Sequence, residues 1–321
     1  MSGLDDGQKK DSQRVKKSEL VVVEKQPLKS YTSWGVGGLA DYFAMPRTTE
    51  DVVAAIEYAA DRSLPITILG GGTNVLISDR GIRGLTICLR KLSAIESAKE
   101  SKHRFELQCL SGTSKSELLK VFLKKKLNPA LFLAGLPGDV GGGVVMNAGV
   151  GELIRPREFQ EITDWIEVVH WDDEAKSVKQ VRLNSDQLTW SYRHCSGWPK
   201  GVITRVGLSW PLDPVEDLIA TVRAANQNRL NKQPLDMPSC GSVFVNPEGF
   251  KSGRLIEEAG LKGASIGGAK VSEKHANFIV NFRSATAQDI HELIESVRKR
   301  VFEHSGVTLR TEVVYLGDWS F

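Results

Sequence analysis

Residues 66–79 place three consecutive glycines between two runs of β-prone residues, in the sequence ITILGGGTNVLISD. The runs at 66–69 and 75–77 predict two strands, joined by the glycine-rich residues 70–74. Glycine adopts backbone angles that are closed to other residues, so the amide groups of such a loop can converge on one point. Converging amides form a concavity that binds anions, typically phosphate. A loose hairpin turn is the alternative interpretation of this stretch.

A second glycine-rich stretch covers residues 133–151, LAGLPGDVGGGVVMNAGVG. Glycine at this density disfavours a stable helix interior, so we predict an irregular backbone cradle around an extended ligand. Apolar Val144, Val145 and Met146 between the glycines indicate burial, whereas the alternative is a flexible loop. Two such cradles in one chain favour a long phosphate-bearing cofactor over a small metabolite.

Composition excludes several classes of protein. The 321 residues suggest about two domains, and 41% hydrophobic with 25% charged residues is typical of a globular protein. A formal net charge of +3 is too small to predict a nucleic-acid partner. No apolar run reaches the roughly 20 residues of a membrane span, and no signal sequence is evident. We therefore expect a cytoplasmic protein with neither a nucleic-acid nor a membrane partner.

The four cysteines are far apart in the sequence and form no CxxC pair. Such spacing argues against a zinc site and against a disulfide scaffold, and it suits a reducing compartment. We accordingly predict no metal site. The cysteines are Cys88, Cys109, Cys195 and Cys240.

Pattern and composition divide the chain into four segments. Residues 1–19 are polar and basic, which predicts a disordered tail. Residues 20–90 and 91–212 each read as an α/β unit, and 213–321 as a separate α+β unit. Helix starts are predicted by capping boxes at Thr48 with Asp51, Ser114 with Glu117 and Thr286 with Asp289. Asp213 before Pro214 predicts another helix start, and the apolar face of that helix would hold Val215, Leu218, Ile219 and Val222. Strands are predicted at 41–44, 85–89, 104–110, 201–208 and 312–317, and a hairpin at 162–170 with 177–183.

Motif searches from the residues alone leave weak candidates. Gly35, Gly37 and Ala40 match G-x-G-x-x-A but precede a strand instead of following one, so a Rossmann site is not predicted. Ser242 does not lie in a G-x-S-x-G elbow, and it reads either as a turn hydroxyl or as a proton donor. Arg193 is suited to binding a carboxylate or phosphate. Glu312 opens a predicted strand and would be costly to bury without a partner.

Taken together, the motifs resemble the UDP-N-acetylenolpyruvoylglucosamine reductase family. The matching blocks run in order from Thr32 to Gly317. They are GVGGLAD, ILGGGTNVLISD, LAGLPGDVGGGVVMNAG, SYRH, QPLDMPSCGSVFVNP, LIEEAGLKGASIGGAKVSEKHANFIVN and TEVVYLG.

This resemblance implies an α+β protein with a two-subdomain FAD-binding fold of the vanillyl-alcohol-oxidase (PCMH) type. A C-terminal α+β domain, residues 213–321, would bind the substrate, a UDP-sugar enolpyruvyl ether. The resemblance also implies that NADPH reduces FAD, and that the flavin passes hydride to the enolpyruvyl C3. The product would be UDP-N-acetylmuramate, in peptidoglycan precursor synthesis for cell-wall growth and division. We expect a monomer.

The resemblance assigns roles to individual residues. Ser242 would donate the proton at C2, and Arg193 with Glu312 would stabilise the enolate-like carboxylate. Tyr192, Asn246 and His275 would contact the substrate. FAD would be held by Gly70, Gly71, Gly72, Thr73, Asn74, Pro137, Gly138, Gly141, Gly142, Ala148 and Gly149.

Two departures from the family pattern bear on these roles. Asp139 stands where a small hydroxyl residue is usual, and an acid there would repel the pyrophosphate unless it turned away. The stretch from Tyr192 to Ser242 lacks an inserted tyrosine-bearing loop, which indicates the subgroup with a more open substrate site.

Two other functions remain as alternatives. A flavoenzyme of the same fold that oxidises alcohols or hydroxy acids would react with oxygen and would not need Ser242. A nucleotide-binding module with a basic tail would bind no flavin and would dock on nucleic acid.

Overall fold

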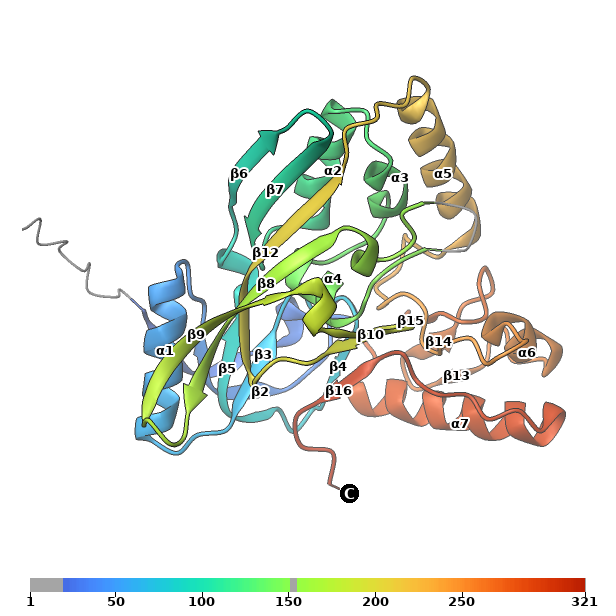
Figure 1. Ribbon diagram of the computed structural model, residues 1–321. Coiled ribbons are helices and arrows are strands. Elements are labelled where there is room, and N and C mark those ends of the chain that lie inside the picture. Colours follow the sequence, from blue (N-terminus) through green and yellow to red (C-terminus); the bar gives the residue numbers. More distant parts are fainter. Residues whose placement is uncertain (1–19, 151–154, 321) are drawn as a thin grey trace, which may run out of the picture.

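The computed structural model describes residues 20–150 and 155–320 (Figure 1). The tail predicted at 1–19 lies outside the described residues. Three groups of elements follow one another along the chain, and the long helix α7 runs along the C-terminal group. Among the described helices, none is long and apolar enough to cross a membrane.

The first group is a four-stranded mixed sheet with the order β1-β2-β5-β3. Helix α1 begins with the predicted capping box, in which Thr48 and Asp51 each accept the other's backbone N–H. The apolar side of α1 packs on this sheet and also on β8 of the next one, so it lies between the two. The elements are β1 (Val22–Pro27), β2 (Leu39–Ala44), α1 (Thr49–Asp61), β3 (Ile66–Leu69), β4 (Val75–Ile77) and β5 (Ile82–Cys88).

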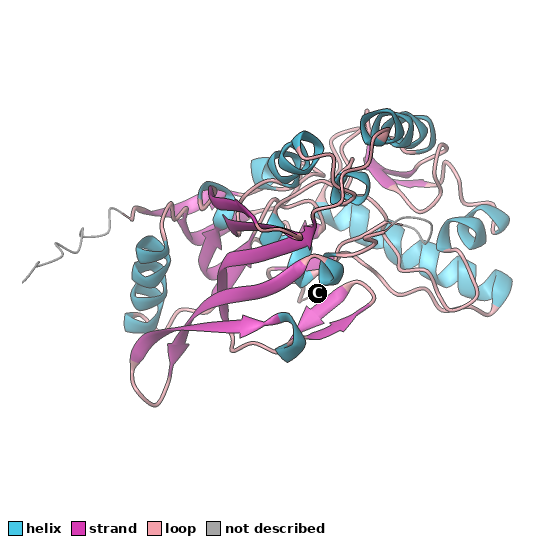
Figure 2. Ribbon diagram, turned by 45° about the horizontal axis from the view of Figure 1, so that its top comes forward, coloured by secondary structure: helices cyan, strands magenta, loops and turns pink. Residues whose placement is uncertain are grey.

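The second group is a five-stranded antiparallel sheet with the order β6-β7-β12-β8-β9, visible as a layer of arrows in Figure 2. Short helices pack on one face of it and enclose a large apolar cluster. The predicted hairpin is confirmed, because β8 and β9 pair from Trp165 with Asn184 to Asp172 with Ser177. The elements are β6 (Ile95–Glu100), β7 (Arg104–Leu110), α2 (Lys115–Lys124), α3 (Pro129–Leu133), α4 (Val140–Val145), β8 (Thr163–Asp172), β9 (Ser177–Asn184), β10 (Thr189–Ser191), β11 (His194–Ser196), β12 (Gly201–Pro211) and α5 (Leu218–Lys232).

The third group is a small sheet, β13-β14-β15, covered by α7. Helix α7 has the predicted capping box, Thr286 with Asp289, and its apolar stripe is buried as expected. Strand β16 returns to the first group, where it pairs in parallel with β4. The elements are α6 (Ser252–Glu258), β13 (Ser265–Ile266), β14 (Ala269–Val271), β15 (Ile279–Asn281), α7 (Ala287–Ser305) and β16 (Val314–Leu316).

The start predicted for the helix after residue 212 is wrong. Instead of beginning just after Asp213, α5 begins at Leu218, and Ile219, which was expected on its apolar face, is exposed. The reason is a tertiary contact: the N–H of Val215 donates to the carbonyl of Lys126, which holds the preceding residues against another loop. Helix α5 packs against α3 and joins the cluster of the second group. The domain boundaries stay a prediction.

The second glycine-rich stretch contains a helix, contrary to the prediction. A Cβ at Gly141 would lie 2.9 Å from the Ser111 Cβ, and one at Gly143 would lie 2.4 Å from a ring atom of Phe159. Close packing of α4 therefore requires glycine, and this tertiary demand overrides low helix propensity. Val144 is buried as expected, whereas Val145 is exposed. Strand β6 was not predicted.

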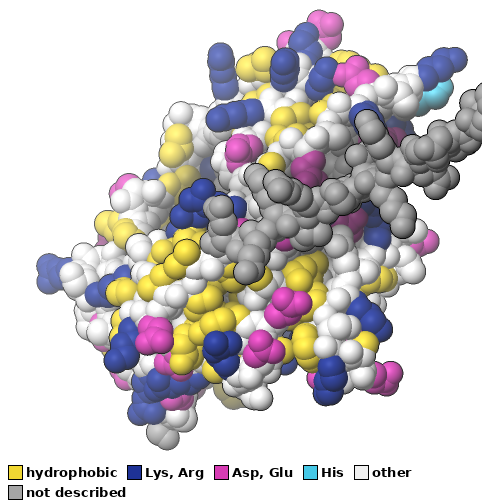
Figure 3. Space-filling model, turned by 90° about the vertical axis from the view of Figure 1, so that its left-hand side faces the viewer, with side chains coloured by type: hydrophobic (Ala, Val, Ile, Leu, Met, Phe, Trp, Pro, Cys, Tyr) yellow, Lys and Arg dark blue, Asp and Glu magenta, His cyan; other side chains and the backbone are white. Residues whose placement is uncertain are grey.

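The first glycine stretch also connects the groups. At its end, Asp79 accepts hydrogen bonds from the N–H groups of Ala287 and Gln288, and so caps α7. Trp34, which is fully buried, donates its indole N–H to the carbonyl of Ile279 at 2.8 Å. These contacts fix the C-terminal group against the segments before β2 and after β4 of the first group. On the α1 side of the molecule, basic and acidic side chains are interspersed (Figure 3).

Candidate functional site

The first glycine loop, residues 70–74, joins two different sheets. Strand β3 pairs with β5 and strand β4 pairs with β16, so the loop is not a hairpin turn. Gly72 has a φ of +68°, and a Cβ there would lie 1.8 Å from the Tyr31 carbonyl oxygen, so only glycine fits. Within residues 20–150 and 155–320, the N–H groups of Gly72, Thr73 and Asn74 donate to no protein acceptor. The loop therefore offers amides to an anion.

The second glycine loop, residues 137–142, touches the first. A Cβ at Gly71 would lie 2.9 Å from the Cα of Gly138, and one at Gly138 would lie 2.7 Å from the Thr73 Oγ1. The two loops thus approach each other as closely as backbones without side chains allow. The structure brings together the two stretches predicted to hold one cofactor.

Ala148 and Gly149 follow α4 and pack against a neighbouring segment. A Cβ at Gly149 would lie 2.1 Å from the Arg157 carbonyl oxygen. Just before them, fully buried Asn147 donates from its Nδ2 to the carbonyl of Ser191 at 3.1 Å. Sequence reasoning missed Asn147, which ties the second glycine stretch to the end of β10.

Asp139 does not turn away from the loops, and its buried carboxylate joins them. Oδ2 accepts from the N–H of Gly71 at 2.5 Å, and Oδ1 accepts from the N–H of Gly142 at 2.7 Å. Burial raises the pKa of Asp139, although both amides and the nearby Lys115 act in the opposite direction. Burial also lowers the pKa of Lys115 to about 8. The Lys115 Nζ donates to the carbonyl of Pro137 at 2.9 Å.

A cavity of about 410 Å³ lies at the N-terminal side of α6, and segments far apart in sequence line it. The lining includes the turn between β10 and β11, the stretch 242–246, the loop after β14 and the segment before β16. All six residues predicted as catalytic or substrate-binding line this one cavity. They are Tyr192, Arg193, Ser242, Asn246, His275 and Glu312.

Arg193 and Glu312 form an ion pair in the cavity wall. Arg193 lies at the tip of the β10–β11 turn with a φ of +60°, a strained conformation that is frequent at functional sites. Its Nε lies 3.1 Å from the Glu312 Oε1. Burial raises the pKa of Glu312, while Arg193 opposes that rise. Exposed Tyr192 stacks on the same guanidinium, 4.9 Å from its ring centre. The partner that Glu312 was expected to need is present.

Backbone pairing places Ser242 beside this ion pair. The N–H of Glu312 donates to the carbonyl of Val243 at 2.8 Å. The buried Asn277 side chain holds the neighbouring residue, Phe244, by accepting from its N–H at 3.0 Å and donating to its carbonyl at 2.8 Å. Asn277 was not predicted, since its role is visible only when the two segments are brought together.

His275 and Asn246 each use one polar atom internally and leave another for the cavity. The His275 Nδ1 accepts from the N–H of Asn277 at 3.2 Å, and burial lowers the pKa of His275. The neutral ring therefore keeps its Nε2–H as a donor. The Asn246 Oδ1 accepts from the N–H of Ser252 at 3.0 Å, which leaves the amide NH₂.

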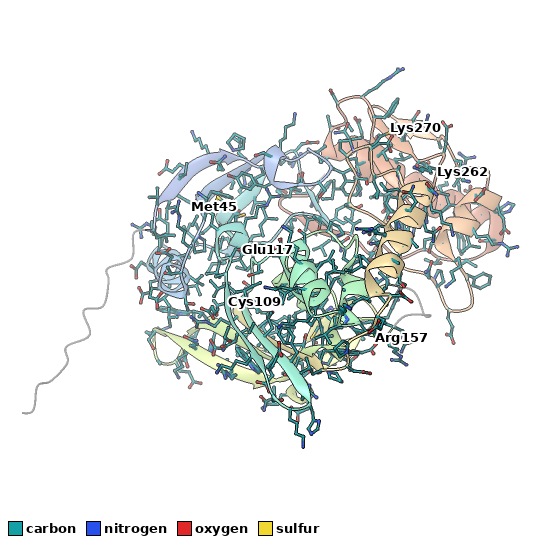
Figure 4. The ribbon with its side chains drawn as sticks, turned by 90° about the horizontal axis from the view of Figure 1, so that it is seen from above. Met45, Cys109, Glu117, Arg157, Lys262 and Lys270 are labelled. Atoms are coloured by element: carbon teal, nitrogen blue, oxygen red, sulfur yellow. The ribbon has the colours of Figure 1, made fainter. Side chains whose placement is uncertain are left out.

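Four cations that sequence reasoning missed also line the cavity: Lys251, Arg254, Lys262 and Lys274. Lys262, labelled on the C-terminal group in Figure 4, pairs with Glu257 at 2.6 Å. Several basic side chains around one cavity suit an anionic ligand. The sequence signal that could have predicted these cations is the group of basic residues near the GLKGASIGGAK block.

A side-chain hydrogen bond joins the glycine loops to the cavity. The Asn74 Nδ2 donates to the backbone carbonyl of Glu312 at 3.0 Å. Asn74 thus ends the first loop and also fixes the segment that carries the cavity's carboxylate. The two regions form one continuous site.

Comparison with known proteins identifies the family. A model described as FAD binding domain matches residues 40–178, and one described as the C-terminal domain of UDP-N-acetylenolpyruvoylglucosamine reductase matches 233–316. The reductase of Synechococcus sp. (strain WH7803) is 39% identical over 300 residues, which cover 92% of this chain and 94% of that one. The chain belongs to the UDP-N-acetylenolpyruvoylglucosamine reductase family.

Further members of the reductase family are similar to this chain over nearly its whole length. The reductase of Myxococcus xanthus is 40% identical and covers 92% of both chains. The crystal structure of the reductase from Thermus caldophilus has a TM-score of 0.73 and 30% identity, covering 92% of this chain and 98% of that one. The predicted fold class is confirmed: an FAD-binding domain of the PCMH type is followed by the reductase C-terminal domain. The chain is an FAD-dependent oxidoreductase.

Proposed function

We propose that this protein uses NADPH and bound FAD to reduce UDP-N-acetylenolpyruvoylglucosamine to UDP-N-acetylmuramate. The reaction belongs to peptidoglycan precursor synthesis in the cytoplasm, and the enzyme acts as a monomer. The observation that supports this proposal most is that a serine, an arginine–glutamate pair and several cations line one cavity next to two glycine loops.

The glycine loops fit the diphosphate of FAD. Gly72, Thr73 and Asn74 present N–H groups without a protein acceptor in the described part of the chain, and glycine at 71 and 138 lets the two loops lie in contact. FAD held there would supply the redox chemistry, the transfer of a hydride from NADPH to the enolpyruvyl C3. The chain's own residues bind and orient the cofactor and the substrate, and one of them donates the proton.

Ser242 donates the proton that completes reduction at C2. Its hydroxyl makes no hydrogen bond to any described residue, so the proton is available to a substrate. The pairing of the 243 and 312 segments holds it beside Arg193 and Glu312. A positioned hydroxyl acts as a general acid when its neighbours stabilise the alkoxide that remains, which Arg193 does here.

Arg193 and Glu312 bind the carboxylate on which negative charge develops. Because the Arg193 Nε already contacts Glu312, the guanidinium orientation is fixed and its remaining N–H groups can face the substrate. The raised pKa of Glu312 favours a carboxyl group that donates a hydrogen bond instead of repelling the enolate.

The cationic part of the cavity binds the UDP diphosphate. Lys251, Lys262 and Lys274 supply positive charge, whereas Asn246 and His275 supply N–H donors. Tyr192, which is half exposed, lines the same cavity and would contact the substrate there.

Anaerobic half-reactions test the proposal. NADPH should bleach the visible flavin band of the purified protein, and UDP-N-acetylenolpyruvoylglucosamine should restore it without oxygen. If the substrate leaves the reduced flavin unchanged while oxygen restores the band rapidly, the protein is an oxidase of the same fold. A colourless protein that gains no flavin band with added FAD would be a nucleotide-binding module.

A further inference from the structure

Asp139 places a carboxylate where the two glycine loops meet. Besides accepting from Gly71 and Gly142, this carboxylate covers Gly70, because a Cβ there would lie 2.5 Å from its Oδ2. The side chain is 5% exposed. One internal anion therefore occupies amides of the loops that are proposed to hold an external one.

Cations and a thiol surround this carboxylate. Lys115 at the start of α2 and Arg90 after β5 both favour its ionised form. The Arg90 Nη2 donates to the carbonyl of Gly71 at 2.8 Å, so Arg90 holds the same loop from the other side. The Cys88 thiol at the end of β5 and Arg193 near Lys115 complete the titratable and charged groups that act here.

Two anions would lie on neighbouring amides of the same loops: Asp139 on those of Gly71 and Gly142, and the diphosphate on those of Gly72, Thr73 and Asn74. Two negative charges this close repel each other strongly in a buried site. A protonated carboxyl removes this repulsion, and it can donate its own O–H to a phosphate oxygen. Burial has already raised the pKa of Asp139, which lowers the free energy needed to protonate it.

We propose that Asp139 makes FAD binding proton-linked: the ionised carboxylate occupies the loop amides, and the flavin diphosphate binds with uptake of one proton by this side chain. The inference rests on the proposed placement of the diphosphate at the two glycine loops. Loading of the enzyme with flavin then depends on pH through one residue.

Titration of the flavin-free full-length chain with FAD tests this, with quenching of flavin fluorescence as the readout. The wild-type Kd should rise with pH above the pKa of Asp139, by up to about tenfold per pH unit. Asp139→Asn, which keeps the shape and can donate to phosphate, should bind at least about tenfold more tightly at pH 8 and lose the pH dependence. Asp139→Thr, which keeps a capping oxygen, should behave in the same way.

Asp289→Asn is the matched control. Asp289 also accepts two backbone N–H groups at a helix start, those of Gly268 and Thr286, but it lies at α7. Its variant should unfold at a lower temperature and bind FAD as the wild type does. Calorimetry of wild-type FAD binding in two buffers of different ionisation heat measures the proton uptake directly and needs no variant.

The outcomes separate the two proposals. Weaker FAD binding by Asp139→Asn, or a wild-type Kd that is independent of pH with no proton uptake, would overturn the role of Asp139 and leave the proposed function intact. Failure of the wild type and both variants to bind FAD would overturn the placement of the diphosphate as well.

Discussion

The glycine loops and the cavity both suit negatively charged groups, yet they are built differently. The loops present backbone N–H groups, and their conformation depends on glycine at Gly72 and on close contact at Gly71 and Gly138. The cavity presents side chains, such as those of Arg193 and Lys262, that come from distant segments. A backbone site tolerates no added atom, whereas a side-chain site fails when one functional group is removed. This contrast predicts which substitutions affect binding and which affect chemistry.

Ser242→Ala should have the largest effect, and it should be confined to the cavity. Removing the proton donor should slow reoxidation of the flavin by the enolpyruvyl substrate about 100-fold to 10,000-fold. Reduction by NADPH and FAD content should stay at wild-type levels. Anaerobic stopped-flow absorbance measures both half-reactions. The control is Ser116→Ala, because Ser116 is an exposed serine on α2. Wild-type speed in both would remove Ser242 from the mechanism.

Arg193→Ala should slow the second half-reaction about 100-fold to 1,000-fold, since it removes the charge that faces the developing enolate. Arg193→Lys keeps a charge but loses the planar contact with Glu312, so it should recover only part of the rate. The same stopped-flow assay applies, together with the flavin-to-protein absorbance ratio. Loss of flavin with an unchanged rate per bound flavin would move Arg193 from the cavity to the cofactor site.

Gly72→Ala should lower FAD affinity about tenfold or more and reduce the midpoint of thermal unfolding. The added Cβ would overlap the Tyr31 carbonyl, so the loop must move. Gly306→Ala is the control, because Gly306 has a similar φ of +71° with nothing within 4 Å of a Cβ. The Gly306→Ala variant should lose only about 1 kcal/mol of unfolding free energy and should bind FAD with unchanged affinity. Equal FAD affinity in both variants would contradict a backbone cradle.

The smallest effect is expected for His275→Gln, in the dependence of stability on pH. Burial lowers the pKa of His275 in the folded state, so the unfolded chain binds the proton more readily. Wild-type stability should therefore fall as pH drops below the unfolded pKa of about 6.5, by at most about 1 kcal/mol. The Gln variant should lack this part of the loss, and His103→Gln, at an exposed position, should retain it. Thermal unfolding at two pH values measures the difference.

Local signals predicted the parts of the fold that depend on neighbouring residues. The capping boxes at Thr48, Ser114 and Thr286 are all present, because a cap needs only a side chain and an N–H three residues away. The predicted start of α5 was wrong because the hydrogen bond between Val215 and Lys126 holds the preceding residues out of the helix. Helix α4 was missed because close packing, not propensity, places its glycines.

The two halves of the site also differed in how far local sequence signals could predict them. Glycine marks the loops directly in the sequence, since no other residue fits at Gly72. The cavity residues were proposed only through the family resemblance, and no local pattern places Ser242 beside Glu312. The carboxylate of Asp139 on the Gly71 amide was beyond sequence reasoning, because it joins residues 68 positions apart.

A crystal structure of the protein with FAD would test the central claim most directly. Two glycine loops and one side-chain cavity should then act as a single site. The diphosphate oxygens are predicted within hydrogen-bonding distance of the N–H groups of Gly72, Thr73 and Asn74, with the flavin ring facing Ser242 and Arg193. A diphosphate bound away from both loops, or a ring directed away from the cavity, would contradict the account.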